Sequence, residues 1–303
     1  MVTKSKGGRI NYFPHAIDRI FMGFVYFFLI SFSLCIIIPV VNIVASSFSS
    51  PTAVSTGKVM FWPVEFSVEG YQRIFESDFI MKGLRNTVIY TVVGTTINII
   101  VTVLAAYPLS RKDIKGRNVF MGIFAFTMLF NGGMIPTYLV VKQLGLLNTM
   151  WALILPGALS VYNMIICRTY FIENLPWELH ECAEIDGCNE IRYLYKIAIP
   201  LAKPILAVMV LLYAVGHWNS YFNALIYLTD PEKIPLQLVL RDILFAGGSK
   251  VNVNDVAEQL KREYMKNLLQ YSCIIFSTVP ILLLYPFIQK YFVKGIMIGA
   301  IKG

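Results

Sequence analysis

Residues 173–204 read ENLPWELHECAEIDGCNEIRYLYKIAIPLAKP and form the longest polar interruption between the apolar runs in the middle of the chain. No Lys or Arg lies between Arg168 and Arg192. The acidic residues of this interval are Glu173, Glu178, Glu181, Glu184, Asp186 and Glu190. A run of like charge is usually a solvated face. Composition alone therefore leaves two interpretations open, a solvated loop or a docking surface for a basic partner.

Local signals predict two short helices in this loop. Gly187 suits the position after a helix end, so a first helix is expected at 177–186. Asn189 can cap a second helix at 190–197, which Pro200 would stop because proline lacks an amide donor. The loop is therefore predicted to turn a corner at Gly187, where the φ angle should be positive.

The composition predicts a membrane protein. Hydrophobic residues make up 56% of the 303 residues and charged residues only 15%, whereas about a quarter of an ordinary soluble domain is charged. The intervals without Asp, Glu, Lys or Arg are 20–57, 86–110, 118–141, 143–167, 204–229 and 267–289. Each exceeds the roughly 20 apolar residues needed to cross the hydrocarbon core. We therefore expect an all-α polytopic membrane protein with six transmembrane helices.

Basic residues predict the orientation of the chain. Cytoplasmic loops carry an excess of Lys and Arg, and the short turn at 110–117 sets four basic residues against Asp113 alone. Both termini are therefore expected to be cytoplasmic. The expected parts are a leader at 1–19, a transmembrane domain at 20–292, outer segments at 49–85 and 230–266, and a tail at 293–303. The net charge of +8 fits contact with membrane lipid and does not imply nucleic-acid binding.

The third predicted span, 118–141, carries its own helix breakers, Asn131-Gly132-Gly133 and Pro136. Unwound backbone at membrane depth is tolerated only where it is buried in protein or faces a water-filled cavity. We therefore expect a bend or an unwound turn there. The other spans are expected as helices at 20–48, 86–109, 148–171, 201–228 and 267–289. The outer segment at 230–266 has room for a further helix after Asn254.

The shortage of ionisable residues in the predicted spans limits the possible energy sources for transport. Ion-coupled carriers place ionisable side chains inside the membrane, and His217 is the only such residue in the six intervals. The sequence also lacks the G-x-x-x-x-G-K-[ST] motif that cradles ATP phosphates. We therefore expect a non-enzymatic transport subunit whose ATP and Mg²⁺ are bound by partner subunits. The five cysteines suggest no metal or redox site, so no cofactor is expected in this chain.

The polar loop resembles a known motif. Glu181-Cys182-Ala183, Gly187 and Ile197-x-Ile199-Pro200 match the spacing of the E-A-A-x3-G-x9-I-x-L-P loop of ATP-binding-cassette importer permeases. Cys182 replaces an alanine and Ile199 a leucine, and both replacements are small or apolar.

Other segments narrow the resemblance to the maltose-type carbohydrate permeases. Asp186-Gly187-Cys188, Trp218-Asn219 and the tail at 293–303 look like the corresponding segments of that group. Residues 130–136, FNGGMIP, are similar to its branch of LplC/YtcP-type proteins from Gram-positive bacteria. The resemblance covers nearly the whole chain from Asn86 onward.

This resemblance implies the type I importer permease fold and a bacterial plasma-membrane location. It implies a second homologous permease, two cytoplasmic ATPase subunits, and a lipid-anchored or periplasmic binding protein that delivers a sugar or oligosaccharide. The positions implied for the ATPase-coupling loop are Glu178, Glu181, Cys182, Ala183, Asp186, Gly187 and Pro200. Glu181 is expected to be exposed, and Ala183 to be small because the ATPase approaches it closely.

Polar and aromatic residues of the spans are candidates for a substrate path, namely Asn131, Tyr162, Trp218, Asn219, Tyr221 and Asn223. Aromatic faces and amide groups suit a sugar, but the same side chains also seal bundles and join helices. Both interpretations stay open for them, and His217 is expected to be a packed residue. An importer subunit for a peptide or polyamine remains the alternative, whereas the broken third span argues against a non-transporting scaffold.

Overall fold

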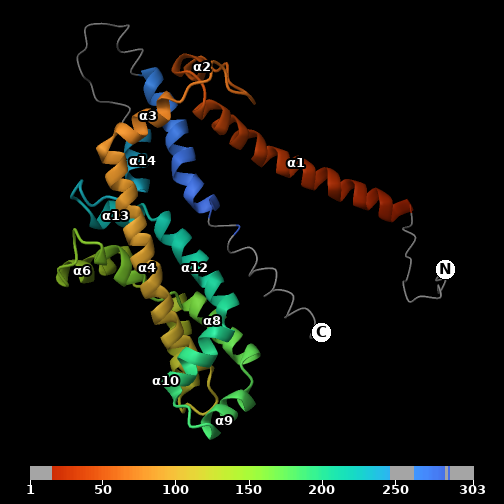
Figure 1. Ribbon diagram of the computed structural model, residues 1–303, viewed down its shortest axis with the longest axis vertical. Coiled ribbons are helices and arrows are strands. Elements are labelled where there is room, and N and C mark those ends of the chain that lie inside the picture. Colours follow the sequence, from red (N-terminus) through yellow and green to blue (C-terminus); the bar gives the residue numbers. More distant parts are fainter. Residues whose placement is uncertain (1–15, 246–262, 284–285, 287–303) are drawn as a thin grey trace. The chain divides into compact units, whose positions relative to one another are not determined.

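The structure, a computed structural model, describes residues 16–245, 263–283 and 286. Every regular element in these residues is a helix (Figure 1), which confirms the all-α prediction for this part of the chain. The tail at 293–303, most of the leader at 1–19 and the start of any helix after Asn254 lie outside the described residues.

The first of two compact units holds residues 1–70 and 253–275. Its helix α1, Ala16–Ser47, spans 32 residues and agrees with the predicted helix at 20–48. Apolar side chains are exposed along most of α1, as expected for a helix that faces lipid or another chain.

A short segment folds back over the end of α1. Asn42 Nδ2 donates to the carbonyl of Val59 (3.0 Å), and the amide of Val64 donates to Ser49 Oγ (3.0 Å). Within this segment α2, Pro51–Ser55, begins at Ser50, whose side chain accepts from the helix amide of Ala53. The outer segment at 49–85 therefore contains a capped helix near its start.

The second unit, residues 71–252 and 276–303, is built around α4, Asp78–Ser110. Helices α8, α12 and α14 all pack against α4 (Figure 1). α4 follows α3, Glu69–Glu76, and starts after Ser77, whose Oγ accepts from the amide of Ile80 (3.4 Å). The predicted start at residue 86 was wrong because it stopped at the charged side chains, which the first turns of α4 hold at its surface.

A buried polar stripe runs along one face of α4. Its members are Thr87, Thr91, Thr95, Asn98 and Thr102. They recur every three or four residues, the spacing that keeps side chains on one helix face. Thr87 accepts a hydrogen bond from the amide of Leu236 (2.8 Å), the first residue of α14, and Thr102 shares one with Tyr213 (2.7 Å) of α12. The stripe therefore joins α4 to the helices around it.

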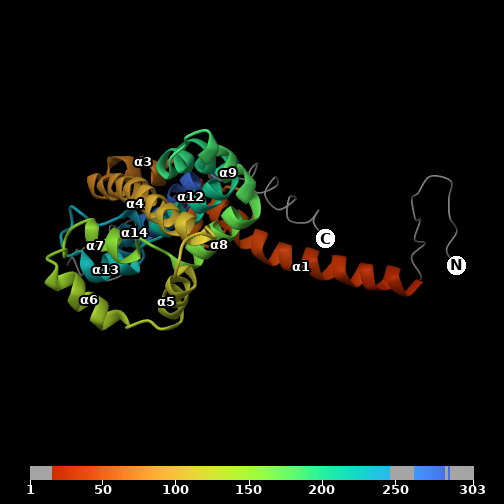
Figure 2. The same cartoon turned by 90° about the horizontal axis from the view of Figure 1, so that it is seen from below.

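The third predicted span is broken where expected. α5, Arg117–Leu129, and α6, Met134–Gln143, meet at 111°. Gly133 has a φ of +91°, and its amide donates to the side chain of Asn131 (2.9 Å). α6 lies apart from α12 in both cartoon views (Figures 1 and 2).

The fourth predicted span is also broken, which the sequence analysis did not predict. α7, Trp151–Ile154, and a 3-10 turn, Leu155–Gly157, are followed by α8, Val161–Asn174, at 52°. The break frees the carbonyls of Gly157 and Ala158. Both accept from Asn98 Nδ2, at 2.7 and 2.9 Å. Asn98 Oδ1 accepts in turn from His217 Nε2 (2.6 Å). The polar stripe of α4 therefore supplies hydrogen bonds to the carbonyls that the break in the helix leaves free.

The fifth predicted helix ends earlier than expected. α12, Lys203–Trp218, stops at Asn219, and α13, Phe222–Tyr227, is a separate short helix. The segment that follows contains α14, Leu236–Phe245. The remaining helical pieces are α9 (Trp177–Ile185), α10 (Glu190–Tyr193), a π turn (Leu194–Ala198), α11 (Ile199–Leu201) and a last helix (Glu263–Leu283).

The number of candidate spans agrees with the sequence prediction. Three single helices are long and apolar enough to cross a membrane: Asp18–Ser47, Asp78–Ser110 and Glu263–Leu283. Three bent pairs pass the same test together, which gives up to six spans among the described residues by length and composition. In the third bent pair, Glu190–Leu201 with Lys203–Trp218, only the second helix, from Pro204 onward, lies within a charge-free interval of the sequence.

Candidate functional site

The polar loop predicted from the sequence forms two helices and a corner. α9 ends at Ile185, and Gly187 follows with a φ of +74°. The amide of Cys188 donates to the carbonyl of Ala183 (2.9 Å), and that of Gly187 donates to the carbonyl of Glu184 (2.9 Å). These two hydrogen bonds form a common helix C-terminal motif, which requires a left-handed backbone conformation at the position of Gly187. The predicted corner and its positive φ angle are therefore confirmed.

The second helix of the loop begins where predicted but does not end where predicted. α10 is capped by Asn189, whose Oδ1 accepts from the amide of Arg192 (2.9 Å). The helical path continues through the π turn and α11, because Pro200 lies in the first turn of α11 and needs no amide partner there. Beyond Leu201 this path meets α12 at 80°.

Most residues proposed for the coupling loop are exposed. The exposed ones are Glu178, Glu181, Cys182, Asp186, Gly187 and Pro200. The carboxylate of Glu181 accepts a hydrogen bond from Trp177 Nε1 (2.7 Å). Ala183 instead lies in the core, 7% exposed, in a cluster with Cys167 and Tyr193. Packing within this chain therefore requires its small side chain, which corrects the expectation that an approaching ATPase would do so.

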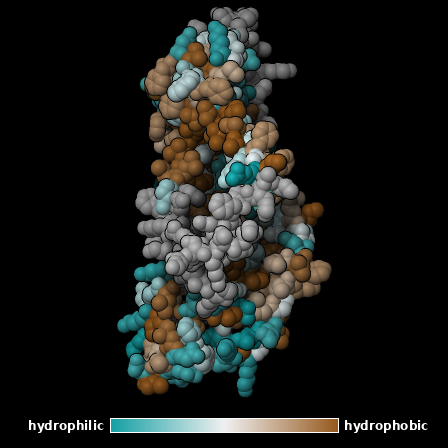
Figure 3. All heavy atoms as spheres, turned by 90° about the vertical axis from the view of Figure 1, so that its right-hand side faces the viewer, coloured by the Kyte–Doolittle hydropathy of each residue, from teal (hydrophilic) through white to brown (hydrophobic). Residues whose placement is uncertain are grey.

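Apolar side chains stand out of the same loop. Ile185 is 85% exposed, Ile191 80% and Tyr195 73%. Figure 3 shows hydrophilic side chains gathered at the end of the unit that holds α9 and α10, with hydrophobic ones among them. These three side chains were not among the residues predicted for the coupling loop. Isoleucines in an otherwise acidic, solvent-facing run were the available signal.

A buried arginine lies behind the loop. Arg111 follows the last residue of α4 and is 8% exposed. Its Nε and Nη2 donate to both oxygens of Asp113 (2.8 Å each), and its Nη1 donates to Glu190 Oε2 (2.7 Å). The hydrogen bond to Asp113 raises the pKa of Arg111 and lowers that of Asp113, so both groups stay charged near neutral pH. In the sequence, Arg111 is one of the four basic residues of the turn at 110–117 that predicted the orientation of the chain.

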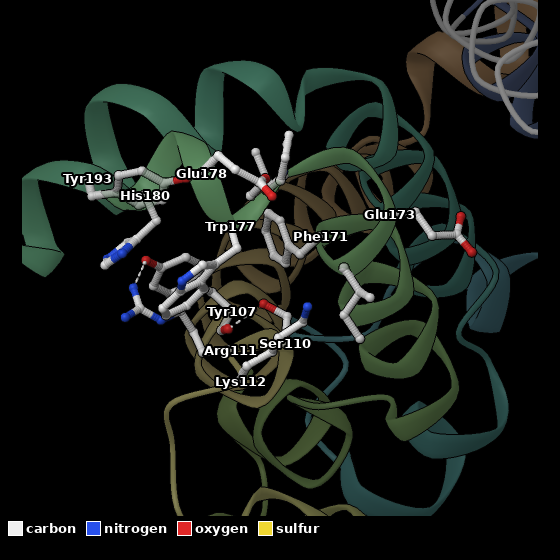
Figure 4. Close-up of a pocket in the computed structure, with 13 residues that line it drawn as sticks. Tyr107, Ser110, Arg111, Lys112, Phe171, Glu173, Trp177, Glu178, His180 and Tyr193 are labelled. Carbon is white, nitrogen blue, oxygen red and sulfur yellow. Dashed lines mark hydrogen bonds between the residues drawn. The ribbon is translucent and has the colours of Figure 1, made fainter. Parts of the chain in front are cut away.

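Aromatic rings of α9 and α10 surround this arginine. The guanidinium of Arg111 lies 5.1 Å from the ring centre of Trp177, within the range of a cation–π contact. His180 stacks on Trp177 (5.1 Å between centroids) and meets the edge of Tyr193 (4.9 Å). Figure 4 shows Trp177 and His180 reaching from α9 towards Arg111 and Tyr107 at the end of α4. Together these residues line a pocket of about 300 Å³.

The candidate substrate-path residues occupy three separate places. Trp218 is 6% exposed and donates to the carbonyl of Ser277 (3.0 Å), while Asn219 donates to the carbonyl of Val215 (3.0 Å) at the end of α12. Exposed side chains occur at Tyr221 and Asn223 beside them, at Tyr162 on α8 and at Asn131 in the α5–α6 break. Among the described residues, no hydrogen bond or ring contact of these six side chains joins the three places.

The described part of the chain shows no cluster of side chains that could bind a metal ion. There, no three or more His, Cys, Asp or Glu side chains lie close enough together to hold a metal ion. The five cysteines, at 35, 167, 182, 188 and 273, are all free thiols.

Comparisons with known proteins agree with this arrangement. Residues 7–298 match the family model described as binding-protein-dependent transport system inner membrane component. The polygalacturonan/rhamnogalacturonan transport system permease protein YtcP of Bacillus subtilis is 42% identical over 94% of this chain and 99% of its own length. Protein LplC of the same organism is also 42% identical, over 88% of this chain and 90% of its own.

A solved structure shows the same fold. A chain from a bacterial ABC transporter involved in the import of the acidic polysaccharide alginate has a TM-score of 0.85 and 37% identity, over 93% of this chain and all of its own. The family match, the two relatives and this structure all extend over most of the chain. The chain therefore belongs to the family of binding-protein-dependent transport system inner membrane components.

Proposed function

We propose that this chain is one of two related permease subunits that together form the membrane pathway of an ATP-driven importer for acidic, uronate-containing oligosaccharides. It is a transport subunit and not an enzyme. ATP and Mg²⁺ would be bound by two cytoplasmic ATPases, and a binding protein outside the membrane would deliver the sugar. Both termini would lie in the cytoplasm, on the side of α9 and α10.

The observation that carries the coupling part of this proposal is the exposed, capped corner at Gly187. It combines acidic side chains with the protruding isoleucines of two short helices, Ile185 of α9 and Ile191 of α10. Such a surface suits a groove that is apolar at its centre and basic at its rim. We assign the coupling role to Glu178, Glu181, Cys182, Ala183, Asp186, Gly187 and Pro200. Ala183 would act from inside, by letting α9 pack closely on the bundle.

The proposed pairing with a second permease is supported by α5. Every side chain of α5 is at least partly exposed, although the helix is predominantly apolar. Apolar side chains such as Phe120, Ile123 and Phe126 are each more than half exposed. Such a surface needs lipid or protein around it. A homologous permease and the surrounding bilayer would cover it.

The substrate class is supported by the relatives. YtcP is named for polygalacturonan and rhamnogalacturonan, and the solved transporter imports alginate. All three polymers contain uronic acids. More distant relatives, such as the arabinooligosaccharide permease AraQ of Halalkalibacterium halodurans, are only 28% identical. We therefore favour an acidic oligosaccharide over a neutral one. The amide and aromatic side chains of Asn131, Tyr162, Trp218, Asn219, Tyr221 and Asn223 would line its path.

A single purification tests the proposal. The chain is tagged and isolated from membranes of its source organism, and its partners are identified by mass spectrometry. We expect a second permease, an ATPase and a binding protein that releases uronate-containing oligosaccharides on denaturation. A neutral oligosaccharide would refute the substrate class, and a peptide or polyamine would refute sugar import. Recovery of the chain without an ATPase would refute the importer assignment.

A further inference from the structure

We propose that Tyr107, Arg111 and Glu190 form a charged latch that fixes the coupling loop to the end of α4, and that these are positioning residues for the coupling of ATP hydrolysis to transport. The inference rests on the proposed function as an ATP-driven importer subunit. Glu190 occupies an unspecified position within the E-A-A motif, whereas Tyr107 and Arg111 belong to a different part of the sequence from the loop.

The latch is a closed set of three hydrogen bonds. Arg111 Nη1 donates to Glu190 Oε2 (2.7 Å) and lies 3.2 Å from the hydroxyl oxygen of Tyr107. That hydroxyl donates to the same Glu190 oxygen (3.1 Å). Each member therefore contacts the other two. Such a set loses its geometry when any one member is replaced.

The latch holds both sides of the glycine corner. Glu190 is the first residue of α10, and its second oxygen lies 3.0 Å from Nε2 of His180 on α9. Arg111 also faces Trp177, the first residue of α9. A single carboxylate and a single guanidinium thus fix two helices whose direct link is the turn at Gly187. The corner can move relative to α4 only if these contacts break.

The arginine of the latch is buried, so its hydrogen-bond donors depend on protein acceptors more than on water. The Arg111 side chain is 8% exposed, whereas that of Glu190 is 57% exposed. Loss of Glu190 would leave the buried guanidinium paired with Asp113 alone and its Nη1 without a carboxylate partner, and a buried donor that loses its charged acceptor is costly. Loss of Arg111 would instead leave a carboxylate that water can reach. The two replacements are therefore expected to differ in severity.

The position of the latch explains why it would act in coupling. α8, α12 and α14 pack against α4, so a displacement of the loop that reaches α4 reaches the centre of the bundle. The chain itself connects α11 to α12 through an 80° bend, which transmits a push poorly. The latch supplies a second, short connection from the loop to the bundle. Coupling through contiguous packed elements of this kind is the physical basis that allosteric transmission requires.

The test uses the assembled transporter in membranes, with Glu190→Gln, Arg111→Lys and the double variant. Glu190→Gln keeps shape and removes the charge. Glu232→Gln is the matched control, because Glu232 forms an exposed ion pair with Lys82 of α4 at 2.8 Å, near the opposite end of the helix. The probe is a mixture of oligogalacturonides with the co-purified binding protein. The measurements are the amount of complex, the amount of bound ATPase, and the probe-stimulated ATP hydrolysis.

We expect normal complex and ATPase levels for all variants, and a loss of probe stimulation of about tenfold for Glu190→Gln. That corresponds to one charged hydrogen bond, on the order of 1.4 kcal/mol. The double variant should lose less than the sum of the two single losses, because both single variants disturb the same Arg111–Glu190 contact. Glu232→Gln should retain stimulation. A simple folding defect would instead lower the amount of complex.

The outcomes separate this inference from the proposed function. A wild-type complex that lacks ATPase refutes the importer assignment itself. A wild-type complex with ATPase but no response to oligogalacturonides refutes the substrate class, and the latch is then tested by amide hydrogen exchange of α9 and α10, which Glu190→Gln should accelerate. Wild-type stimulation or exchange in Glu190→Gln, additive effects in the double variant, or equal losses in Glu232→Gln overturn the latch.

Discussion

Replacement of Asn98 by alanine should strongly destabilise the second unit. Asn98 is 0% exposed and makes three hydrogen bonds, to the carbonyls of Gly157 (2.7 Å) and Ala158 (2.9 Å) and to His217 (2.6 Å). Hydrogen bonds between membrane helices contribute about 0.6 kcal/mol on average and at most about 1.7 kcal/mol. Three lost bonds therefore predict a loss of about 2–5 kcal/mol in the free energy of unfolding.

The assay is reversible unfolding of the detergent-solubilised protein by a denaturing detergent, with helix content as the signal. Thr96→Ala is the control on the same helix, because the Thr96 hydroxyl is exposed and bonds only to the carbonyl of Val92 in its own turn (2.8 Å). The control should change stability by less than about 0.5 kcal/mol. If Asn98→Ala costs no more than Thr96→Ala, the polar stripe does not hold the broken fourth span.

Three further predictions follow from close contacts and exposure. Gly187→Val should strain a φ of +74° and reduce ATPase pull-down while insertion stays normal; unchanged pull-down and uptake would remove the corner from the coupling element. Gly94→Ala would place a methyl group about 2.5 Å from His217 Nε2 and should lower stability through the Asn98 bond; wild-type unfolding would contradict this. Ile185→Ser should weaken ATPase binding without destabilising the permease, since the side chain is 85% exposed, and equal binding would exclude it from the interface.

Charge-free intervals predicted the existence of the spans well and their ends poorly. The charge-free interval of the second helix starts at residue 86, because Arg85 is charged and marks its boundary. α4 starts at Asp78 instead and holds Lys82 at the surface, paired with Glu232. Charged side chains at exposed positions do not end a helix. A composition window cannot distinguish them from a true loop.

The break at Asn131–Gly133 was predictable and the break before α8 was not. In the first, two glycines follow an asparagine whose side chain bonds to the Gly133 amide. In the second, Pro156 and Gly157 lie among apolar residues and could equally belong to a kinked helix. What stabilises the open form is Asn98, which lies 59 residues earlier in the sequence than Gly157. Local signals contain no information about such a partner.

For the candidate site too, local features could be predicted from the sequence and tertiary contacts could not. The motif around Glu181 and the corner at Gly187 are local, so the sequence located them. The side of α9 on which Ala183 packs and the contact from Arg111 to Glu190, 79 residues apart, depend on tertiary structure. Arg111 was interpreted as a topology signal because basic residues next to spans usually have that role. Only its burial distinguishes it from its neighbours.

The polar stripe of α4 also constrains how the chain is made. Asn98 finds its carbonyl partners 59 residues later, Thr102 its tyrosine 111 residues later, and Thr87 its amide 149 residues later. At about 5–20 residues per second, synthesis of the last interval takes roughly 7–30 s. Until each partner has been made, the corresponding side chain of nascent α4 lacks the hydrogen bond that it has in the folded chain. The polar contacts of α4 are therefore complete only after α14 has been made, which places the closing of this bundle late in synthesis.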